Sequence, residues 1–228
     1  MFISELFESI QGEGRYVGVP SVFLRTSGCN LRCWFCDTPE TSWEPRGQHM
    51  PLEDVTAKLL ESECDHAVLT GGEPLLVSEM VPLTESLSQA GKVITIETAG
   101  TVFLPVQADL ISLSPKLANS TPSLERSERW HYRHEELRHQ PDVIQQFVQE
   151  YDYQIKFVVD RPEDINDVLR WCDEFPTVTP DHVYLMAQAI EADVLQTKNA
   201  WLNELAETHG FQVSPRLHIE LFGHTPGT

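Results

Sequence analysis

Short apolar runs alternate with longer amphipathic stretches along most of the chain beyond residue 50. The apolar runs predict strands at Ser21–Thr26, His66–Leu69, Val93–Glu97, Leu110–Leu113, Gln154–Val159, Val183–Met186 and Leu217–Phe222. The amphipathic stretches predict helices at Leu52–Ser62, Ser78–Ala90, Asp142–Gln149, Pro162–Asp173 and Ala192–His209. Repeated strand–helix–strand units are typical of a mostly parallel sheet with right-handed crossovers, so the pattern predicts an α/β fold.

The length of the chain limits how far such a sheet can close. A complete barrel of eight strand–helix units takes about 250 residues, whereas this chain has 228. The pattern therefore predicts a partial, open β/α barrel, and without repeats or linker-like segments it predicts one domain over residues 1–228. Leu117–Gln140 interrupts the alternation and predicts a long loop or an irregular helix. Its histidines, His131, His134 and His139, are expected to be solvated rather than metal ligands.

Unusual short motifs follow four successive predicted strands. Cys29–Cys36 follows the first strand, Gly71–Pro74 the second, Thr98–Thr101 the third and Ser114–Lys116 the fourth. Ligands of parallel α/β sheets bind outside the carboxyl ends of the strands. These four segments are therefore expected to line one shared pocket.

The chain is strongly acidic, with 16 Lys and Arg against 35 Asp and Glu and a formal net charge of −19. Such a surface repels phosphate backbones and anionic lipid, which disfavours direct binding to nucleic acid or to membranes. No apolar run is long enough to span a bilayer, and the N-terminus lacks the features of a secretion signal. We expect a cytoplasmic protein in which a basic residue inside a pocket is a candidate anion ligand.

Three of the five cysteines lie within eight residues, at Cys29, Cys33 and Cys36. This C-x3-C-x2-C spacing can place thiolates on three corners of an iron–sulfur cube and leave the fourth iron open to a small molecule. Zinc is the alternative, but a closed zinc site needs a fourth ligand, and no other His or Cys stands at the usual spacing. The isolated Cys64 and Cys172 are interpreted as small buried apolar residues.

The cysteine motif, with an aromatic residue before its third cysteine, resembles the radical S-adenosylmethionine superfamily. Gly71-Gly72-Glu73-Pro74 at a strand end resembles the second motif of that superfamily. The resemblance implies a 4Fe-4S cluster that binds and cleaves S-adenosylmethionine to a 5′-deoxyadenosyl radical. It places Phe35, Cys36 and Asp37 against that cofactor, Gly72 beside its methionine part, and Glu73 as an acceptor from its ammonium group.

Seven segments resemble one family of that superfamily, 7-carboxy-7-deazaguanine synthase, over nearly the whole chain: Glu8–Gly14, Phe23–Arg25, Gly28–Leu31, Cys36–Thr38, Thr70–Pro74, Glu97–Thr101 and Ser114–Lys116. Members of that family convert 6-carboxy-5,6,7,8-tetrahydropterin to 7-carboxy-7-deazaguanine with loss of ammonia, in queuosine biosynthesis. The resemblance implies a carbon–nitrogen lyase that needs S-adenosylmethionine, a 4Fe-4S cluster and Mg2+. It also implies a homodimer and an electron donor such as flavodoxin or ferredoxin.

The same resemblance assigns roles to individual residues. Those that would bind the pterin substrate are Ile10, Gln11, Gly12, Glu13, Arg25 and Thr70. An amide such as that of Gln11 can donate to and accept from the pterin edge, and an arginine can form a bidentate pair with the substrate carboxylate. Those that would contact S-adenosylmethionine after the fourth strand are Ser114, Pro115 and Lys116, and Thr38 matches the Mg2+ ligand position.

A few positions stay open or depart from the family. Lys156 and Gln188 are interpreted as facing the pocket, with a lysine reaching solvent from an edge strand as an equal alternative for Lys156. Ala99 stands where family members often carry Asn or Ser, and Pro215–Gly223 resembles the ending of only some members.

Three other functions compete with this interpretation. A glycyl-radical-enzyme activase would share the cysteine motif and the partial barrel, but it acts on a protein and would not need Arg25 or the Gln11–Gly14 segment. A non-catalytic zinc-binding module would bind one metal ion per chain and would not cleave S-adenosylmethionine. A plain iron–sulfur electron carrier is disfavoured by the presence of three rather than four clustered cysteines.

Overall fold

A computed structural model describes all residues from Met1 to Thr228. Its nine strands form one sheet in the order β3-β1-β2-β4-β5-β6-β7-β8-β9. In chain order these are β1 Phe2–Ile10, β2 Pro20–Thr26, β3 Gln48–His49, β4 His66–Gly71, β5 Val93–Thr98, β6 Leu110–Leu113, β7 Tyr153–Val159, β8 Val183–Ala187 and β9 Gln212–Val213. Pairing is parallel from β2 to β9 and antiparallel for β1 and β3. The two edge strands do not pair with each other, so the sheet is an open β/α barrel, as predicted.

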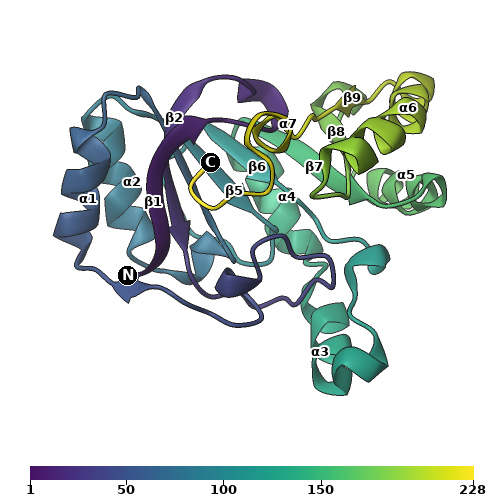
Figure 1. Cartoon of the computed structure of the whole chain (residues 1–228), viewed down its shortest axis with the longest axis horizontal. Coiled ribbons are helices and arrows are strands. Elements are labelled where there is room, and N and C mark those ends of the chain that lie inside the picture. The colour runs from purple at the N-terminus through teal and green to yellow at the C-terminus, as the bar shows by residue number, and fades with distance from the viewer.

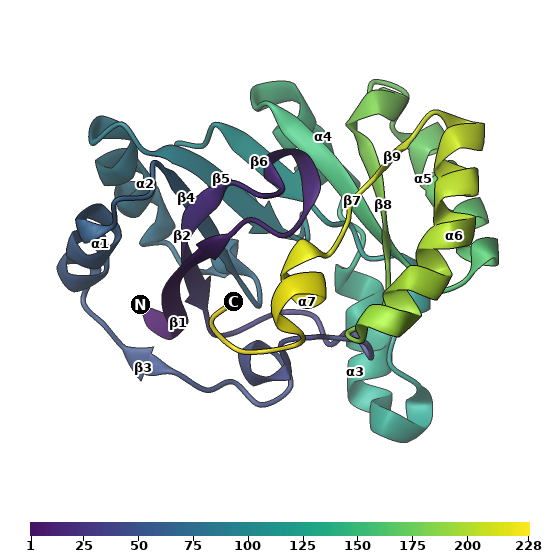
Figure 2. The ribbon, with the colours of Figure 1, turned by 45° about the horizontal axis from the view of Figure 1, so that its top comes forward.

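Seven helices accompany the sheet: α1 Leu52–Glu61, α2 Met80–Gln89, α3 Leu124–Leu137, α4 Pro141–Glu150, α5 Ile165–Glu174, α6 Ala192–His209 and α7 Leu217–Phe222. Figure 1 shows α1, α2, α4, α5 and α6 around the outside of the curved sheet, and both views place α7 and the C-terminus on its other side, near β1 (Figures 1 and 2). A cluster of 37 buried apolar residues joins the helices to the sheet. No helix combines the length and the apolar character that a membrane crossing requires.

The predicted helices and the first six predicted strands are confirmed, with ends displaced by a few residues. The central strands carry long apolar runs because helices and cavity cover both faces of a parallel sheet. All four residues of β6, for example, are buried.

The prediction of a strand at Leu217–Phe222 is wrong, because this segment is helix α7. Its apolar and polar residues alternate, but so short a segment does not separate strand from helix by periodicity. The alternating apolar residues are also not all buried on one face. Ile219 is 1% exposed, whereas Leu221 and Phe222 are 58% and 46% exposed. The last strand is instead the two-residue β9, which pairs with β8.

Strand β1 was not predicted from the sequence, although it is the longest strand of the sheet. It carries Glu5, Glu8 and two serines, and most of its residues are only half-buried. Its antiparallel pairing with β2 sets Glu5 opposite Arg25. The first strand therefore brings a carboxylate to the predicted anion-binding arginine.

The segment Leu117–Gln140 contains an irregular helix, one of the two predicted forms. A 3₁₀ turn at Ala118–Ser120 precedes α3, whose backbone leaves the helical region at Ser127, with φ −171° and ψ 106°. Figures 1 and 2 show α3 projecting away from the body of the sheet.

Candidate active site

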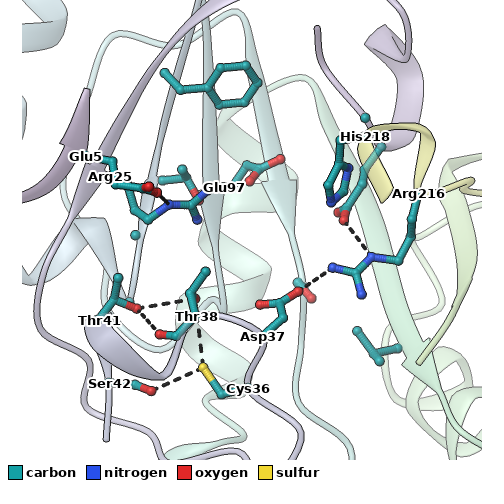
Figure 3. A pocket seen from close by; sticks show the side chains of 18 of the residues that line it. Glu5, Arg25, Cys36, Asp37, Thr38, Thr41, Ser42, Glu97, Arg216 and His218 are labelled. Atoms are coloured by element: carbon teal, nitrogen blue, oxygen red, sulfur yellow. Dashed lines mark hydrogen bonds and ion pairs between the residues drawn. The ribbon is translucent and has the colours of Figure 1, made fainter. Parts of the chain in front are cut away.

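A cavity of about 470 Å³ lies at the carboxyl ends of the parallel strands, a volume ordinary for a small-molecule site. It is lined by the end of β1, the cysteine loop, the ends of β4 to β8, and the C-terminal residues. Of the residues assigned from the sequence, those that line it are Ile10, Gln11, Gly12, Glu13, Arg25, Cys29, Cys33, Phe35, Cys36, Asp37, Thr38, Thr70, Gly72, Ser114 and Lys116. Figure 3 shows part of this lining. The expected shared pocket is therefore confirmed.

The three clustered cysteines are all free thiols that face this cavity from one loop. Burial raises the pKa values of Cys29 and Cys33 to about 12. Buried thiols of this kind give up their protons when iron binds them, because the metal ligand is the thiolate. Cys36 Sγ lies 3.1 Å from Ser42 Oγ and 3.9 Å from Thr38 Oγ1, and either contact can orient it (Figure 3). Three soft donors on one loop fit an iron–sulfur cluster.

The glycine motif after β4 packs against the cysteine loop. A Cβ atom added to Gly72 would lie 2.3 Å from the carbonyl oxygen of Gly28 and 2.6 Å from that of Thr41. Glu73 N donates to Gly28 O at 2.9 Å, which ties the two loops together. Gly72 is therefore required for close approach of one backbone to another, in addition to lining the cavity.

Two assigned residues do not line the cavity. Glu73 is fully buried, and its carboxylate accepts three hydrogen bonds, from Leu75 N at 3.1 Å, Thr98 Oγ1 at 2.8 Å and Ala99 N at 2.9 Å. Burial raises the pKa of Glu73, and the three donors only partly offset that rise. The structure thus gives the Glu73 side chain a role inside the protein, joining the loops after β4 and β5, rather than one facing a ligand. Pro115 likewise lies outside the lining.

Ala99, the position that departs from the family pattern, lines the cavity, and its backbone N–H donates to Glu73 Oε2 at 2.9 Å. Lys116, beyond the next strand, folds back so that Nζ donates to Ser114 O at 2.6 Å and Ser114 Oγ at 2.8 Å.

Arg25 forms an ion pair inside the cavity. Its Nε donates to Glu5 Oε2 at 2.7 Å, and the two side chains are 19% and 21% exposed. Phe7 lies beneath the guanidinium, with its ring centroid 5.9 Å from Cζ. Glu5 occupies one side of the planar guanidinium fork, so Arg25 is held in place with its remaining N–H groups directed at the cavity (Figure 3).

Buried Lys156 joins two partly exposed carboxylates in the lining of the cavity. Lys156 Nζ lies 2.6 Å from Glu13 Oε2 and 3.5 Å from Glu97 Oε1, and Gln11 Nε2 donates to the same Glu97 oxygen at 3.2 Å. Burial alone would lower the pKa of Lys156, but the two carboxylates outweigh it and raise that pKa. Lys156 is 3% exposed and lines the cavity, which excludes a lysine that reaches solvent from an edge strand.

The C-terminal segment lines the cavity with residues that were not assigned from the sequence, among them Arg216 and His218. Both line the cavity, beside Gln188 at the end of β8, which was expected to do so. The sequence signal that could have indicated Arg216 is its positive charge, because a basic residue in so acidic a chain is a candidate anion ligand. Its position could not be read from the sequence, since its carboxylate partner Glu13 lies 203 residues away.

Comparison with known proteins identifies the family. Residues 23–118 match the Radical SAM superfamily. The chain is 44% identical over 232 residues to the 7-carboxy-7-deazaguanine synthase of Rhodopirellula baltica, covering 100% of this chain and 89% of that protein. It is 42% identical over 236 residues to the 7-carboxy-7-deazaguanine synthase of Halobacterium salinarum, covering 99% and 92%.

The chain belongs to the 7-carboxy-7-deazaguanine synthase family. Among solved structures of that fold, QueE from Escherichia coli matches with a TM-score of 0.68 at 24% identity, covering 95% of this chain and 94% of that chain. Streptococcus suis SuiB bound to precursor peptide SuiA matches with a TM-score of 0.58 at 12% identity, covering 84% and 47%. At these identities the two structures confirm the fold alone.

The sequence left an iron–sulfur cluster and zinc as alternatives for the cysteine loop. Because the chain belongs to the synthase family and matches the Radical SAM superfamily, the iron–sulfur cluster is the correct interpretation. The structure contains no group of three or more His, Cys, Asp or Glu side chains arranged to hold a single ion. The isolated Cys64 and Cys172 are half-buried and pack against the apolar core.

The expectation that the three histidines near α3 are solvated is wrong for His134, which is fully buried. Arg32 N donates to His134 Nδ1 at 3.1 Å, so the ring proton lies on Nε2, 2.8 Å from Ser120 Oγ. Burial is the main reason that the pKa of His134 falls to about 4. His131 and His139 are half-buried and contact Pro122 O and Glu174. In this family member His134 thus anchors α3 to the cysteine loop.

We expect His134 to make the stability of the protein depend on pH between about 6.5 and 4. Because the folded-state pKa lies below the ordinary value, this stabilisation is present above pH 6.5 and is lost as the pH falls toward 4. The free energy of unfolding should fall with decreasing pH, by at most ~1.4 kcal/mol per pH unit for one proton. H134N removes the titrating ring but keeps an acceptor for Arg32 N. Measured by urea unfolding at several pH values, its free energy of unfolding should depend less steeply on pH than that of the wild type. Equal slopes for the two proteins would contradict this assignment.

Proposed function

We propose that this protein is a 7-carboxy-7-deazaguanine synthase. It converts 6-carboxy-5,6,7,8-tetrahydropterin to 7-carboxy-7-deazaguanine with loss of ammonia, a lyase reaction in queuosine and related 7-deazapurine biosynthesis. The observation that carries the proposal is 44% identity over the whole chain to a synthase of that name. The convergence of the family's predicted residues on one cavity supports it.

Cys29, Cys33 and Cys36 would hold the cluster, and the wall formed by Phe35, Asp37, Gly72, Ser114 and Lys116 would bind S-adenosylmethionine. Bound there, a 4Fe-4S cluster supplies the electron that cleaves this cofactor to the 5′-deoxyadenosyl radical. The remaining task of the chain is to orient the two small molecules and exclude water from them.

Another part of the cavity lining suits a pterin carboxylate. Gln11 and Glu13 supply amide and carboxylate groups for the polar edge of the ring. Arg25, held from one side by Glu5, supplies a positive charge with free N–H groups for the carboxylate. Ile10, Gly12 and Thr70 complete this part of the lining, and Phe7 and Phe23, stacked with centroids 5.0 Å apart, add an apolar surface.

Several finer features belong to the same proposal. Thr38 would ligate Mg2+ through its hydroxyl, which lines the cavity 3.4 Å from Thr41 Oγ1, with the other ligands from substrate and water. We further propose that residues 1–228 act as one domain, in a cytoplasmic homodimer, with reduction by a flavodoxin or ferredoxin. The continuous nine-stranded sheet supports the single domain.

The proposal is tested by reconstituting the protein with iron and sulfide in the absence of oxygen and recording its absorption. Reductant, S-adenosylmethionine, the pterin and Mg2+ are then added, and products are followed by mass. We expect a brown protein that forms 5′-deoxyadenosine and 7-carboxy-7-deazaguanine. Cleavage of the cofactor with the pterin unchanged would contradict the substrate and favour an activase, and a colourless protein that retains only zinc would contradict the cluster.

A further inference from the structure

The C-terminal segment from Ser214 to His218 lies directly against the loop that follows β1. Gly14 N donates to Ser214 Oγ at 2.9 Å, and Leu217 N donates to Gly12 O at 3.0 Å. A Cβ atom added to Gly12 would lie 2.0 Å from His218 Nδ1, so the absence of a side chain at Gly12 makes this packing possible. Two segments that are 200 residues apart in sequence therefore form one wall of the cavity.

Arg216 lies at the centre of this contact and joins three parts of the chain. Its Nε donates to Glu13 Oε1 at 3.3 Å, its Nη1 to Ala189 O at 2.6 Å, and its Nη2 to Asp37 Oδ2. Glu13 belongs to the loop after β1, and Asp37 stands in the cysteine loop between Cys36 and Thr38. Figure 3 shows the Arg216 guanidinium beside the carboxylate of Asp37.

The energetics of this contact favour a fixed geometry. Arg216 is 7% exposed, so its charge is compensated almost entirely by these partners. Burial alone would lower the pKa of Arg216, but the carboxylates of Asp37 and Glu13 outweigh it and raise that pKa. The planar fork of an arginine can bond two carboxylates and a carbonyl at once, which a lysine ammonium at the end of a flexible stem does less well.

We infer that Arg216 is a positioning residue that sets the pterin against S-adenosylmethionine by holding Glu13 and Asp37 in a fixed relation. This inference rests on the proposed function, in which Glu13 faces the pterin and Asp37 the cofactor. Loss of Arg216 frees the Asp37 carboxylate and leaves Glu13 held by Lys156 alone, so the two carboxylates are no longer fixed relative to each other. The radical would then form at a normal rate but meet a misplaced substrate.

R216Q and R216K test this inference in the reconstituted protein. Before any reductant is added, R216Q is titrated with the pterin by calorimetry in the presence of S-adenosylmethionine. Binding should be weaker by about 10- to 100-fold, the effect that loss of an outer-shell partner has at metal sites. During turnover, R216Q should release more 5′-deoxyadenosine per product than the wild type, with KM for the pterin raised more than kcat is lowered. R216K should fall between the two, because it keeps the charge but not the fork.

A double-mutant cycle with Glu13 separates positioning from a general loss of stability. If Arg216 acts through Glu13, replacing it should cost little further affinity once Glu13 has been replaced. The affinity of E13Q/R216Q for the pterin should then lie within about threefold of that of E13Q. R170Q, which removes an arginine whose side chain is 73% exposed, is the matched control and should behave as wild type. If R216Q fails to fold, R216K is judged by the same titration, turnover ratio and cycle.

Each outcome decides a different claim. Wild-type pterin affinity and a wild-type product ratio in folded R216Q or R216K would overturn the inference while leaving the proposed function intact. The inference would also be overturned if the fold-loss of pterin affinity in E13Q/R216Q equalled the product of the losses in E13Q and R216Q. Arg216 would then act independently of Glu13. A wild-type protein that neither binds nor converts the pterin would instead overturn the proposed function itself.

Discussion

Replacing Cys29, Cys33 or Cys36 with alanine should abolish cluster binding, and product formation should fall to the level of a reaction without protein. The three thiols are the cysteine donors that the cluster loop directs into the cavity, and the two other cysteines, Cys64 and Cys172, do not line it. A cluster held by two thiolates is labile because its protein ligation is incomplete. Iron content and visible absorption measure the loss of the cluster, and product analysis by mass measures the loss of turnover in the same preparation.

C64A and C172A are the matched controls for these variants. Both cysteines are half-buried against the apolar core, away from the cavity lining. Their replacement should leave iron content and turnover unchanged. Retention of a full iron complement by C33A, or loss of iron in C64A, would contradict the assignment of the cluster loop.

Replacing Lys156 with methionine should lower the free energy of unfolding by about 3–5 kcal/mol, the cost of breaking a buried ion pair from one side. The lysine side chain is 4% exposed, and its removal leaves Glu97 with one neutral partner, Gln11, while Glu13 keeps only Arg216. The pKa of Lys156 is raised above its ordinary value of 10.5, so its stabilisation is fully present below pH 10.5. The pKa of Glu13 is lowered below 4.5, so its contribution is fully present above that pH. Urea unfolding at pH 7 therefore measures the whole effect.

K198M is the control for the loss of a lysine. Lys198 Nζ lies 2.5 Å from Asp160, but the two side chains are 18% and 35% exposed. Solvent reaches this pair more than the Lys156 pairs, so its loss should cost about 1 kcal/mol or less. The hydrogen bond from Lys198 Nζ to Gln188 O, at 2.6 Å, adds about 1 kcal/mol, so K198M should still destabilise less than K156M. A K156M variant that unfolds at the same urea concentration as K198M would contradict the buried network.

The sequence predicted the parts of the site that local patterns define. The cysteine loop, the glycine motif and the segment at Ser114 each follow a strand whose apolar run is visible by itself. Because parallel strands end at the same edge of a sheet, their convergence followed from the fold class. Arg25 was expected in the cavity as a charged residue within an apolar strand, whereas the same pattern left two alternatives open for Lys156, which the structure decides in favour of the cavity.

The parts that the sequence did not predict depend on contacts between distant segments. The partners of Arg216 are set by how the C-terminus folds back, and the misassigned strand at Leu217–Phe222 hid that return. Glu73 was assigned to the cofactor by the resemblance of its motif, and the sequence does not show that the fold supplies donors to its carboxylate from Leu75, Thr98 and Ala99. His134 looked solvated in a polar segment, but the kinked helix turns it toward Arg32 and Ser120.

The central claim is that this cavity carries out the ring contraction of a pterin carboxylate. Its most direct test is the amount of ammonia released together with 7-carboxy-7-deazaguanine when the reduced, loaded protein acts on 6-carboxy-5,6,7,8-tetrahydropterin. We expect ammonia and the deazaguanine in equal amounts, and neither product with C33A. Formation of 5′-deoxyadenosine while the pterin is recovered intact and no ammonia appears would contradict the claim.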